Sequence, residues 1–148
     1  MDKISFRLVA QGIPASPPVL PPPGAGATVT FEGIVRDHNE GRKVLRLEYS
    51  AYPRLAQSEV ERILDEAVQE FGLLRADCVH RIGPLEIGEC AVKVWVAAAH
   101  RHEAFAGCAY IMDQIKSRVP IWKRELYADG DCQWVGCSEA HRHAGPAT

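Results

Sequence analysis

The segment from residue 90 to residue 120 constrains the fold more than any other part of the chain. It begins with CAVKVWVAAA, the most apolar run of the sequence, which predicts a strand near the centre of a sheet. Apolar residues then recur at helical spacing until Pro120, which cannot continue a helix. The helix predicted over residues 100–119 is expected to pack on that strand through Ala104, Phe105, Cys108, Ile111, Met112 and Ile115.

The remaining pattern predicts an α+β fold in which helices cover a sheet. Alternating or β-branched runs at residues 3–10, 27–35, 44–52 and 76–82 predict strands, and residues 121–127 and 132–135 predict a hairpin. Gly83 and Pro84 are expected to end one strand, and residues 86–89 to form a turn into the next. Pro53 opens a second helix, residues 53–71, whose apolar stripe is Leu55, Val60, Ile63, Leu64, Ala67, Val68 and Phe71.

Three segments lack a regular pattern. Residues 13–26 are rich in proline and are expected to form an extended connector without chemistry of its own. Residues 36–43 are polar throughout and predict a mobile loop, and residues 136–148 predict a flexible tail. A length of 148 residues suits one domain spanning 1–148.

Composition limits the classes of partner. A formal net charge of −2 provides no global basic field for nucleic acid, and no apolar run is long enough to span a membrane. The first residues lack the pattern of a signal peptide, and five cysteines in no regular framework fit reduced thiols. We therefore expect a cytoplasmic protein that binds neither nucleic acid nor membrane.

The helix predicted over residues 100–119 opens on His100 and Arg101, although positive charge at a helix N-terminus is disfavoured by roughly 0.3–1 kcal/mol. Free backbone N–H groups together with cationic side chains make this end suitable for a bound anion. Arg101 and Lys116 would lie roughly 22 Å apart on one helix, because a helix rises ~1.5 Å per residue. A metabolite of nucleotide size cannot contact both. We therefore expect a homodimer in which the helix start of one copy meets the helix end of the other.

Lys116 and Lys123 flank Pro120 and can converge at the corner between helix and strand. A partly desolvated lysine beside another cation can act as a nucleophile or a general acid or base. The alternative is that one lysine complements the helix dipole and the other is solvated. Arg36, directly after a strand, either binds a phosphate or carboxylate or forms a surface salt bridge. Phe31 on that strand faces a site or, as the pattern favours, the core.

No metal site or cofactor is predicted. Cys132, Cys137, His141 and His143 are spaced C-x4-C-x3-H-x-H, which departs from common structural zinc patterns. The sequence also contains no phosphate-binding P-loop, no dinucleotide-binding G-x-G-x-x-G and no G-x-S-x-G.

Five motifs together resemble the catalytic (large) subunit family of molybdopterin synthase, and the resemblance runs from about residue 26 to residue 135. They are GATVTFEGIVRDHNEG (26–41), HRIGPLEIGE (80–89), AHRHEAF (99–105), MDQIK (112–116) and VPIWKRE (119–125). The resemblance implies an α/β-hammerhead-like fold, a mixed sheet with two main helices and a small additional β-subdomain. It implies transfer of sulfur to cyclic pyranopterin monophosphate, which becomes the dithiolene molybdopterin of molybdenum cofactor biosynthesis.

The resemblance also implies partners and site residues. Sulfur arrives as a thiocarboxylate on the C-terminus of a small ubiquitin-like subunit, in a heterotetramer built on a dimer of large subunits. Lys116 is the lysine most tied to catalysis, and Lys123 assists binding or proton transfer. His100 and Arg101 are supplied by the neighbouring copy. The implied substrate-binding set is Phe31, Ile34, Val35, Arg36, His100, Arg101, Lys116, Lys123, Arg124 and Glu125.

Two departures from the family pattern affect the ends of the chain. The proline-rich connector stands where the family has a helix. The family also places an arginine shortly after a Trp-Val pair, whereas here the nearest arginine after Trp134 is Arg142. Two other functions remain open: a non-catalytic module that binds a pterin or a ubiquitin-like tail, and an anion-binding regulatory domain.

Overall fold

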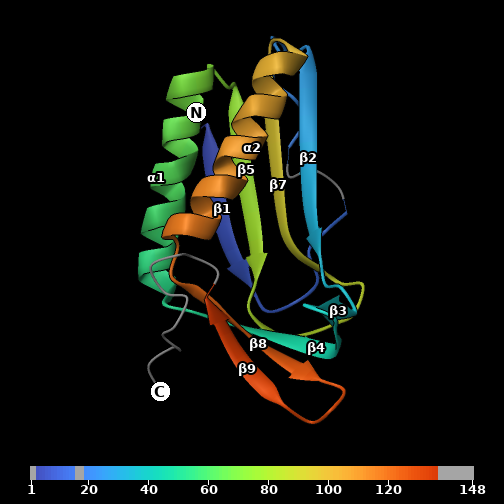
Figure 1. Cartoon of the computed structure of the whole chain (residues 1–148). Helices are drawn as coiled ribbons and strands as arrows, with labels where there is room; N and C mark the ends of the chain where they lie inside the picture. The colour runs from blue at the N-terminus through green and yellow to red at the C-terminus, as the bar shows by residue number, and fades with distance from the viewer. Residues whose placement is uncertain (1–2, 16–18, 137–148) are drawn as a thin grey trace.

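A computed structural model describes residues 3–15 and 19–136 of the chain. Its first sheet has four strands in the order β1 (Ile4–Val9), β5 (Arg75–Arg81), β7 (Cys90–Ala98) and β2 (Ala27–Ile34). β1 runs parallel to β5, and the other neighbours are antiparallel. The helices α1 (Pro53–Phe71) and α2 (Arg101–Arg118) lie side by side over one face of this sheet (Figure 1). The prediction that residues 90–99 form an interior strand is confirmed.

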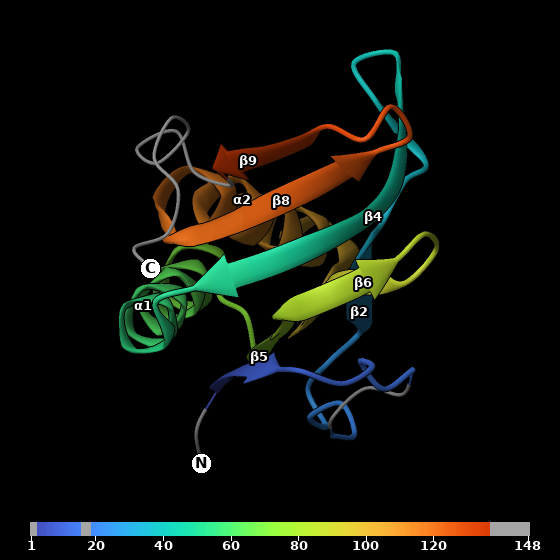
Figure 2. The same ribbon diagram turned by 90° about the horizontal axis from the view of Figure 1, so that it is seen from below.

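A second sheet, of five strands, lies at one end of the first sheet (Figure 2). β4 (Arg42–Ala51) is central in it, pairing with β6 (Gly83–Glu86) on one side and β8 (Ile121–Tyr127) on the other. β9 (Cys132–Gly136) pairs with β8, and the short β3 (His38–Asn39) pairs with the start of β4. The α+β fold with two helices, a mixed sheet and a small β-subdomain is therefore confirmed.

Two apolar cores hold these layers together. The larger core lies between the helices and the first sheet and includes Ile63, Leu64, Val94 and Ile111, each fully buried. Burying a side chain of this size contributes about 1.5–3 kcal/mol. The smaller core joins β4 to the ends of β2, β6 and β7 through Val35, Val44, Leu47, Leu85, Ala91 and Tyr127. This second core fixes the small strands against the end of β2.

The proline-rich connector between β1 and β2 contains no helix or strand among its described residues. Two of its carbonyls accept hydrogen bonds from Lys93 of β7: Nζ lies 2.9 Å from the oxygen of Pro14 and 2.6 Å from that of Ala15. Only 7% of Lys93 is exposed, so these bonds satisfy an ammonium group that would otherwise be buried alone. The connector thus has a structural role in this chain.

The expected break at residues 83–84 is confirmed, since β5 ends at Arg81, but a short strand that was not predicted begins there. Gly83 has a φ of +89°, which turns the chain out of β5, and a strand, β6, follows immediately. Of the described strands, β6 pairs with β4 alone. Pro84 is tolerated there because an edge strand does not need every backbone N–H.

Residues 36–43 are not a loop throughout. Asn39 pairs with Arg42, and the two residues between them, Glu40 and Gly41, have positive φ values of 50° and 77°. Positive φ at both central residues is the geometry of a type I′ hairpin turn, which matches the twist of paired strands. A polar run was therefore interpreted as a loop although it closes the β3–β4 hairpin.

Three apolar residues expected in the core are exposed instead. Phe105 on α2 is 61% exposed, Leu55 on α1 is 62% exposed and Phe31 on β2 is 38% exposed. Their neighbours Ala56 and Ala104 are fully buried. Leu55 and Phe105 therefore lie at the edge of each apolar helix face, where a step of one residue turns the side chain by about 100° toward solvent.

Candidate functional site

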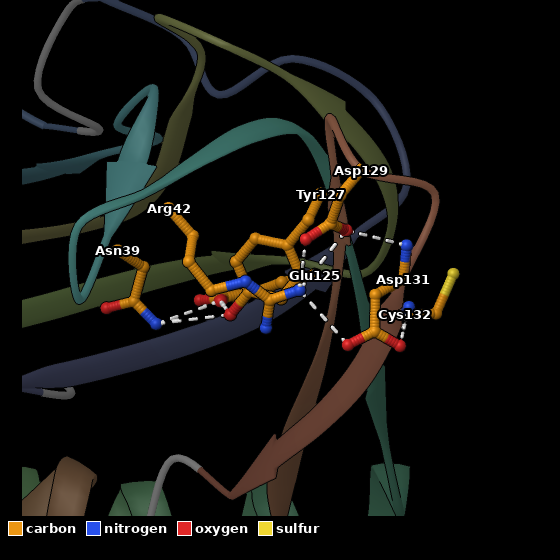
Figure 3. A network of polar contacts seen from close by, with 7 residues as sticks. All are labelled: Asn39, Arg42, Glu125, Tyr127, Asp129, Asp131 and Cys132. Carbon is orange, nitrogen blue, oxygen red and sulfur yellow. Dashed lines mark hydrogen bonds and ion pairs between the residues drawn. The ribbon is translucent and has the colours of Figure 1, made fainter.

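Glu125 is the centre of a network of polar contacts that joins β8 to the β3–β4 hairpin. Only 2% of this residue on β8 is exposed. Its Oε2 accepts hydrogen bonds from the Tyr127 hydroxyl and from Asn39 Nδ2, the latter at 2.9 Å (Figure 3). Its Oε1 lies 3.2 Å from Nζ of Lys123. The carboxylate therefore holds an ammonium on one oxygen and two neutral donors on the other.

These contacts keep Glu125 ionised in spite of its burial. Burial raises the pKa of a carboxyl group, but the hydrogen bond from Tyr127 and the charge of Lys123 outweigh it, so the pKa of Glu125 lies below its ordinary value. Burial and the hydrogen bond to Glu125 raise the pKa of Tyr127. The phenol accordingly remains a proton donor to the carboxylate.

Strand geometry explains why these three side chains meet. Lys123, Glu125 and Tyr127 alternate along β8 and so share one face of it. Arg124 lies on the other face, where its Nη2 is 3.1 Å from Glu48 Oε2 and its guanidinium is 5.7 Å from the centre of the Trp134 ring. The structure therefore separates Arg124 from Lys123 and Glu125, although all three belong to the predicted set.

The ring of Tyr127 is also held by a cation–π contact. The guanidinium of Arg42 lies 3.7 Å from the centre of the Tyr127 ring. Arg42 Nη2 in turn lies 2.9 Å from Asp129 Oδ2 and 3.0 Å from Asp131 Oδ2, both in the turn between β8 and β9 (Figure 3). The β3–β4 hairpin supplies Asn39 and Arg42, so the network joins this hairpin to β8 and its turn.

A second group of basic side chains lies at the start of α2. Here a shallow recess of about 620 Å³ is lined by Gly26, Ala99, His100, Arg101, His102 and Phe105. A Cβ on Gly26 would lie 2.3 Å from the carbonyl oxygen of Ala99, so only glycine permits this approach. The volume is sufficient for a small metabolite. The predicted histidine and arginine thus line one recess.

The β2 strand separates this recess from the other predicted residues. Ala27 pairs with Ala98 at one end of β2, and Ile34 pairs with Cys90 at the other. Since a strand rises ~3.4 Å per residue, the two ends of β2 stand roughly 24 Å apart, with the recess beside one end and Arg36 just beyond the other. Within one copy of the chain, His100 and Arg101 therefore do not share a site with Arg36.

Ile34, Val35 and Arg36 lie at the opposite end of β2 from this recess, and Phe31 lies within the strand. Ile34 and Arg36 are exposed, Phe31 is half-exposed, and Lys116 is exposed in the last turn of α2. Val35 differs, because its side chain is buried in the smaller core. Its N–H donates to the Glu89 carbonyl at 3.0 Å, and its carbonyl accepts from Gly88 at 2.9 Å. Val35 thus anchors the segment that presents Arg36.

Comparisons with known proteins identify the family of this chain. The family model described as MoaE protein matches residues 14–118. The chain belongs to the MoaE family. It is 49% identical over 118 residues to the molybdopterin synthase catalytic subunit of Pyrococcus abyssi, which covers 80% of this chain and 77% of that relative.

Solved structures agree with this assignment. The crystal structure of molybdopterin synthase from Staphylococcus aureus matches with a TM-score of 0.80 at 34% identity, over 92% of this chain and 98% of that one. A Helicobacter pylori complex of subunits 1 and 2 of molybdopterin-converting factor matches with a TM-score of 0.62 at 22% identity, over 78% of this chain and 74% of that one. At this identity the second match supports the fold.

In this member of the MoaE family, two residues that sequence reasoning missed hold the site together. Asn39 lies within the motif at residues 26–41, in a polar run that predicts a mobile loop. Tyr127 lies in a run that predicts only one strand of a hairpin. The period-two alternation of Lys123, Glu125 and Tyr127 is a signal that could have placed the tyrosine beside the carboxylate. No local pattern places Asn39 there, because its contact with Glu125 spans 86 residues.

The remaining predictions concern metals, the tail and membranes. Within residues 3–15 and 19–136, no group of three or more His, Cys, Asp or Glu side chains is arranged to hold a metal ion. Arg142, Cys137, His141 and His143 lie outside the described residues. Neither of the helices in the described part of this MoaE-family chain is both long and apolar enough to cross a membrane.

Proposed function

We propose that this chain is the catalytic subunit of a molybdopterin synthase. It transfers sulfur from the thiocarboxylated C-terminus of a small ubiquitin-like subunit to cyclic pyranopterin monophosphate and so forms the dithiolene of molybdopterin. Membership of the MoaE family and 49% identity to a molybdopterin synthase catalytic subunit support the activity. The observation that carries the proposed site is the ammonium of Lys123, held 3.2 Å from the buried carboxylate of Glu125.

The substrate binds by its phosphate. The guanidinium of Arg36 forms charge-assisted hydrogen bonds to the phosphate oxygens, and His100 and Arg101 add further donors. Phe31 and Ile34, which expose apolar surface on β2, provide contacts for the pterin ring. Arg142 and Arg124 are peripheral members of this set.

The amines supply the chemistry. Attack by sulfur opens the cyclic phosphate, and water later releases the carboxylate of the partner subunit. Each step transfers protons and builds negative charge. Lys116 and Lys123 stabilise that charge and act as general acids or bases. Glu125 keeps the Lys123 ammonium in place. No redox step is required, because sulfur arrives already activated.

Two copies of the chain complete each site. Arg101 and Lys116 lie in the first and last turns of the same helix, α2, and the recess at its start is remote from Arg36. We therefore assign His100 and Arg101 to the site of the neighbouring copy, with one small subunit per site. The solved Helicobacter pylori complex of two subunits supports such a partner. Free thiols at Cys78, Cys90, Cys108 and Cys132 support a cytoplasmic location.

The test is product formation from the thiocarboxylated small subunit and the cyclic phosphate precursor. Changing Lys116→Ala or Lys123→Ala is expected to lower kcat by about 10²–10⁴-fold, the usual contribution of a general acid or base. Lys3→Ala is the matched control, because Lys3 is exposed and directly precedes β1, at the edge of the first sheet.

Full activity in the Lys116→Ala protein would contradict the catalytic assignment. Binding of the precursor and the partner tail without any product, in the unmodified protein, would instead support a non-catalytic module. Equal competition by ordinary nucleotides would support an anion-binding regulatory domain.

A further inference from the structure

The Lys123–Glu125 pair depends on two groups that have no charge. Glu125 is 2% exposed, and a buried carboxylate is unstable unless hydrogen-bond donors surround it. Lys123 supplies one contact, at Oε1. Asn39 and Tyr127 supply the others, both at Oε2, and they come from different elements.

We propose that Asn39 and Tyr127 are positioning residues of the sulfur-transfer site, which hold the Glu125 carboxylate so that its free oxygen fixes the Lys123 ammonium. This inference rests on the proposed function, because it takes Lys123 to be the amine of the sulfur-transfer site that the network positions. Neither residue contacts the reacting atoms directly. Each acts through Glu125.

The surroundings of Tyr127 favour this role over that of an ordinary core residue. Only 2% of Tyr127 is exposed, and its ring lies beneath the guanidinium of Arg42. Arg42 is itself held by Asp129 and Asp131, so the ring has little freedom to turn. The hydroxyl is thereby fixed toward Glu125 (Figure 3).

Asn39 adds a connection to the phosphate end of the site. It stands three residues after Arg36, on the β3–β4 hairpin, and donates across 86 positions of sequence to Glu125. The same amide nitrogen lies 3.4 Å from the Tyr127 hydroxyl. The segment that presents Arg36 is therefore tied to the strand that presents Lys123, which sets the distance between phosphate-binding and amine groups.

Loss of the two donors has a defined consequence for Lys123. Burial then favours the protonated, neutral form of Glu125, and a neutral carboxyl does not hold an ammonium. The amine of Lys123 is then no longer held against the carboxylate, so it is more accessible and reacts faster with acylating reagents. Lys116 provides an internal reference, because its side chain is exposed in the last turn of α2.

The experiment is competitive labelling of the large subunit with acetic anhydride, with the rates at Lys123 and Lys116 read by mass spectrometry. Glu125→Gln removes the carboxylate itself and therefore gives the largest expected rise in the Lys123/Lys116 rate ratio. Tyr127→Phe, which keeps the ring beneath Arg42, and Asn39→Ala are each expected to raise the Lys123/Lys116 rate ratio at least threefold. Glu48→Gln is the control, since it weakens the Arg124 ion pair on the opposite face of β8 without touching Glu125, and its ratio should equal that of the unmodified protein.

An unchanged ratio in both Tyr127→Phe and Asn39→Ala, with Glu125→Gln responding, would overturn the proposal. Thermal unfolding of each variant identifies any that does not fold. Tyr127→Phe removes a single hydroxyl and is expected to fold, so the test can be made even if Asn39→Ala does not fold. In the complete enzyme, the two variants should lower kcat by about tenfold with little change in KM, because a misplaced group impairs the reaction more than binding.

The two readouts separate this inference from the proposed function. A raised labelling ratio together with full activity of Lys123→Ala would contradict the role of Lys123 in sulfur transfer while the positioning of its ammonium stands. Lower activity with an unchanged labelling ratio would overturn the positioning role. Restored labelling and activity in Asn39→Gln, which keeps the amide donor, would support it.

Discussion

At the scale of single residues, His80 is the buried titratable group that most affects the response to pH. Only 5% of it is exposed, and its Nδ1–H donates to the carbonyl of Arg81 at 2.7 Å. Its ring meets that of Tyr49 edge to face, with the centroids 5.0 Å apart, and so joins β5 to β4. Burial lowers the pKa of His80 to about 4.

The lowered pKa of His80 predicts a loss of stability in mild acid. The unfolded chain binds a proton below its ordinary pKa of 6.5, whereas the folded chain does so only below about 4. Stability is therefore complete above pH 6.5 and falls between the two values. Lowering the pH from 7.5 to 5 should remove about 2 kcal/mol of the free energy of unfolding through this residue.

Urea unfolding at the two pH values measures this loss. His80→Gln keeps a donor for the Arg81 carbonyl and removes the titration, so its stability should change less with pH than that of the unmodified protein. His102→Gln is the control, because His102 is exposed on α2. Equal pH dependence in all three proteins would refute the assignment.

At the scale of elements, the two helices are joined by one arginine in addition to their apolar contact. Arg118 of α2 lies 2.6 Å from Glu59 Oε1 and 2.7 Å from Glu66 Oε1, both on α1. The Tyr110 hydroxyl donates to the same Glu66 oxygen at 2.9 Å. The hydrogen bond from Arg118 lowers the pKa of Glu66, so the ion pair persists at neutral pH and is lost as the pH falls through the acid range.

Replacement of Arg118 tests this contact between the helices. Arg118→Met should lower the free energy of unfolding by about 1 kcal/mol at pH 7, since the groups are only partly buried and water screens their charges. The difference should shrink in 1 M salt and below pH 4. Arg62→Met is matched to it, because Arg62 lies 3.7 Å from Glu59 and is 65% exposed, and it should change stability by no more than a few tenths of a kcal/mol.

At the scale of the whole molecule, the separation of the two cationic ends predicts complementation between copies. Arg101→Ala and Lys116→Ala should each inactivate both sites of a homodimer. Mixed dimers then contain one site that carries both changes and one that carries neither. After unfolding and refolding together, an equal mixture should regain about one quarter of the unmodified activity, because half the dimers are mixed.

The control for complementation is the pair Lys116→Ala and Lys123→Ala, whose residues flank one corner of the chain. If both belong to the same copy at each site, a mixture of these variants regains nothing. Activity restored by that pair, or absent from the Arg101 and Lys116 pair, would contradict the composite site. Light scattering of the refolded mixtures confirms that dimers are present.

Local pattern predicted the main elements of this chain because their apolar periods are strong. The helix over residues 53–71 begins at Pro53 and ends before Gly72, whose φ of +64° suits the residue after a helix. Residues 90–99 are apolar apart from Lys93, and a nearly continuous apolar run is typical of a strand buried on both faces. Motif resemblance likewise identified the family, since five separated motifs are rarely matched together.

The sequence by itself determined the two helices, the interior strand and the family, and it supplied the charged residues for which a chemical role is proposed. Only the tertiary structure decided how those residues are grouped. It brought Asn39 to Glu125 across 86 positions, turned Arg124 to the opposite face and placed His100 at the far end of β2 from Arg36. The physical reason is that periodicity arises from neighbours along the chain, whereas a buried carboxylate is satisfied by whichever donors the packed fold brings within hydrogen-bond reach.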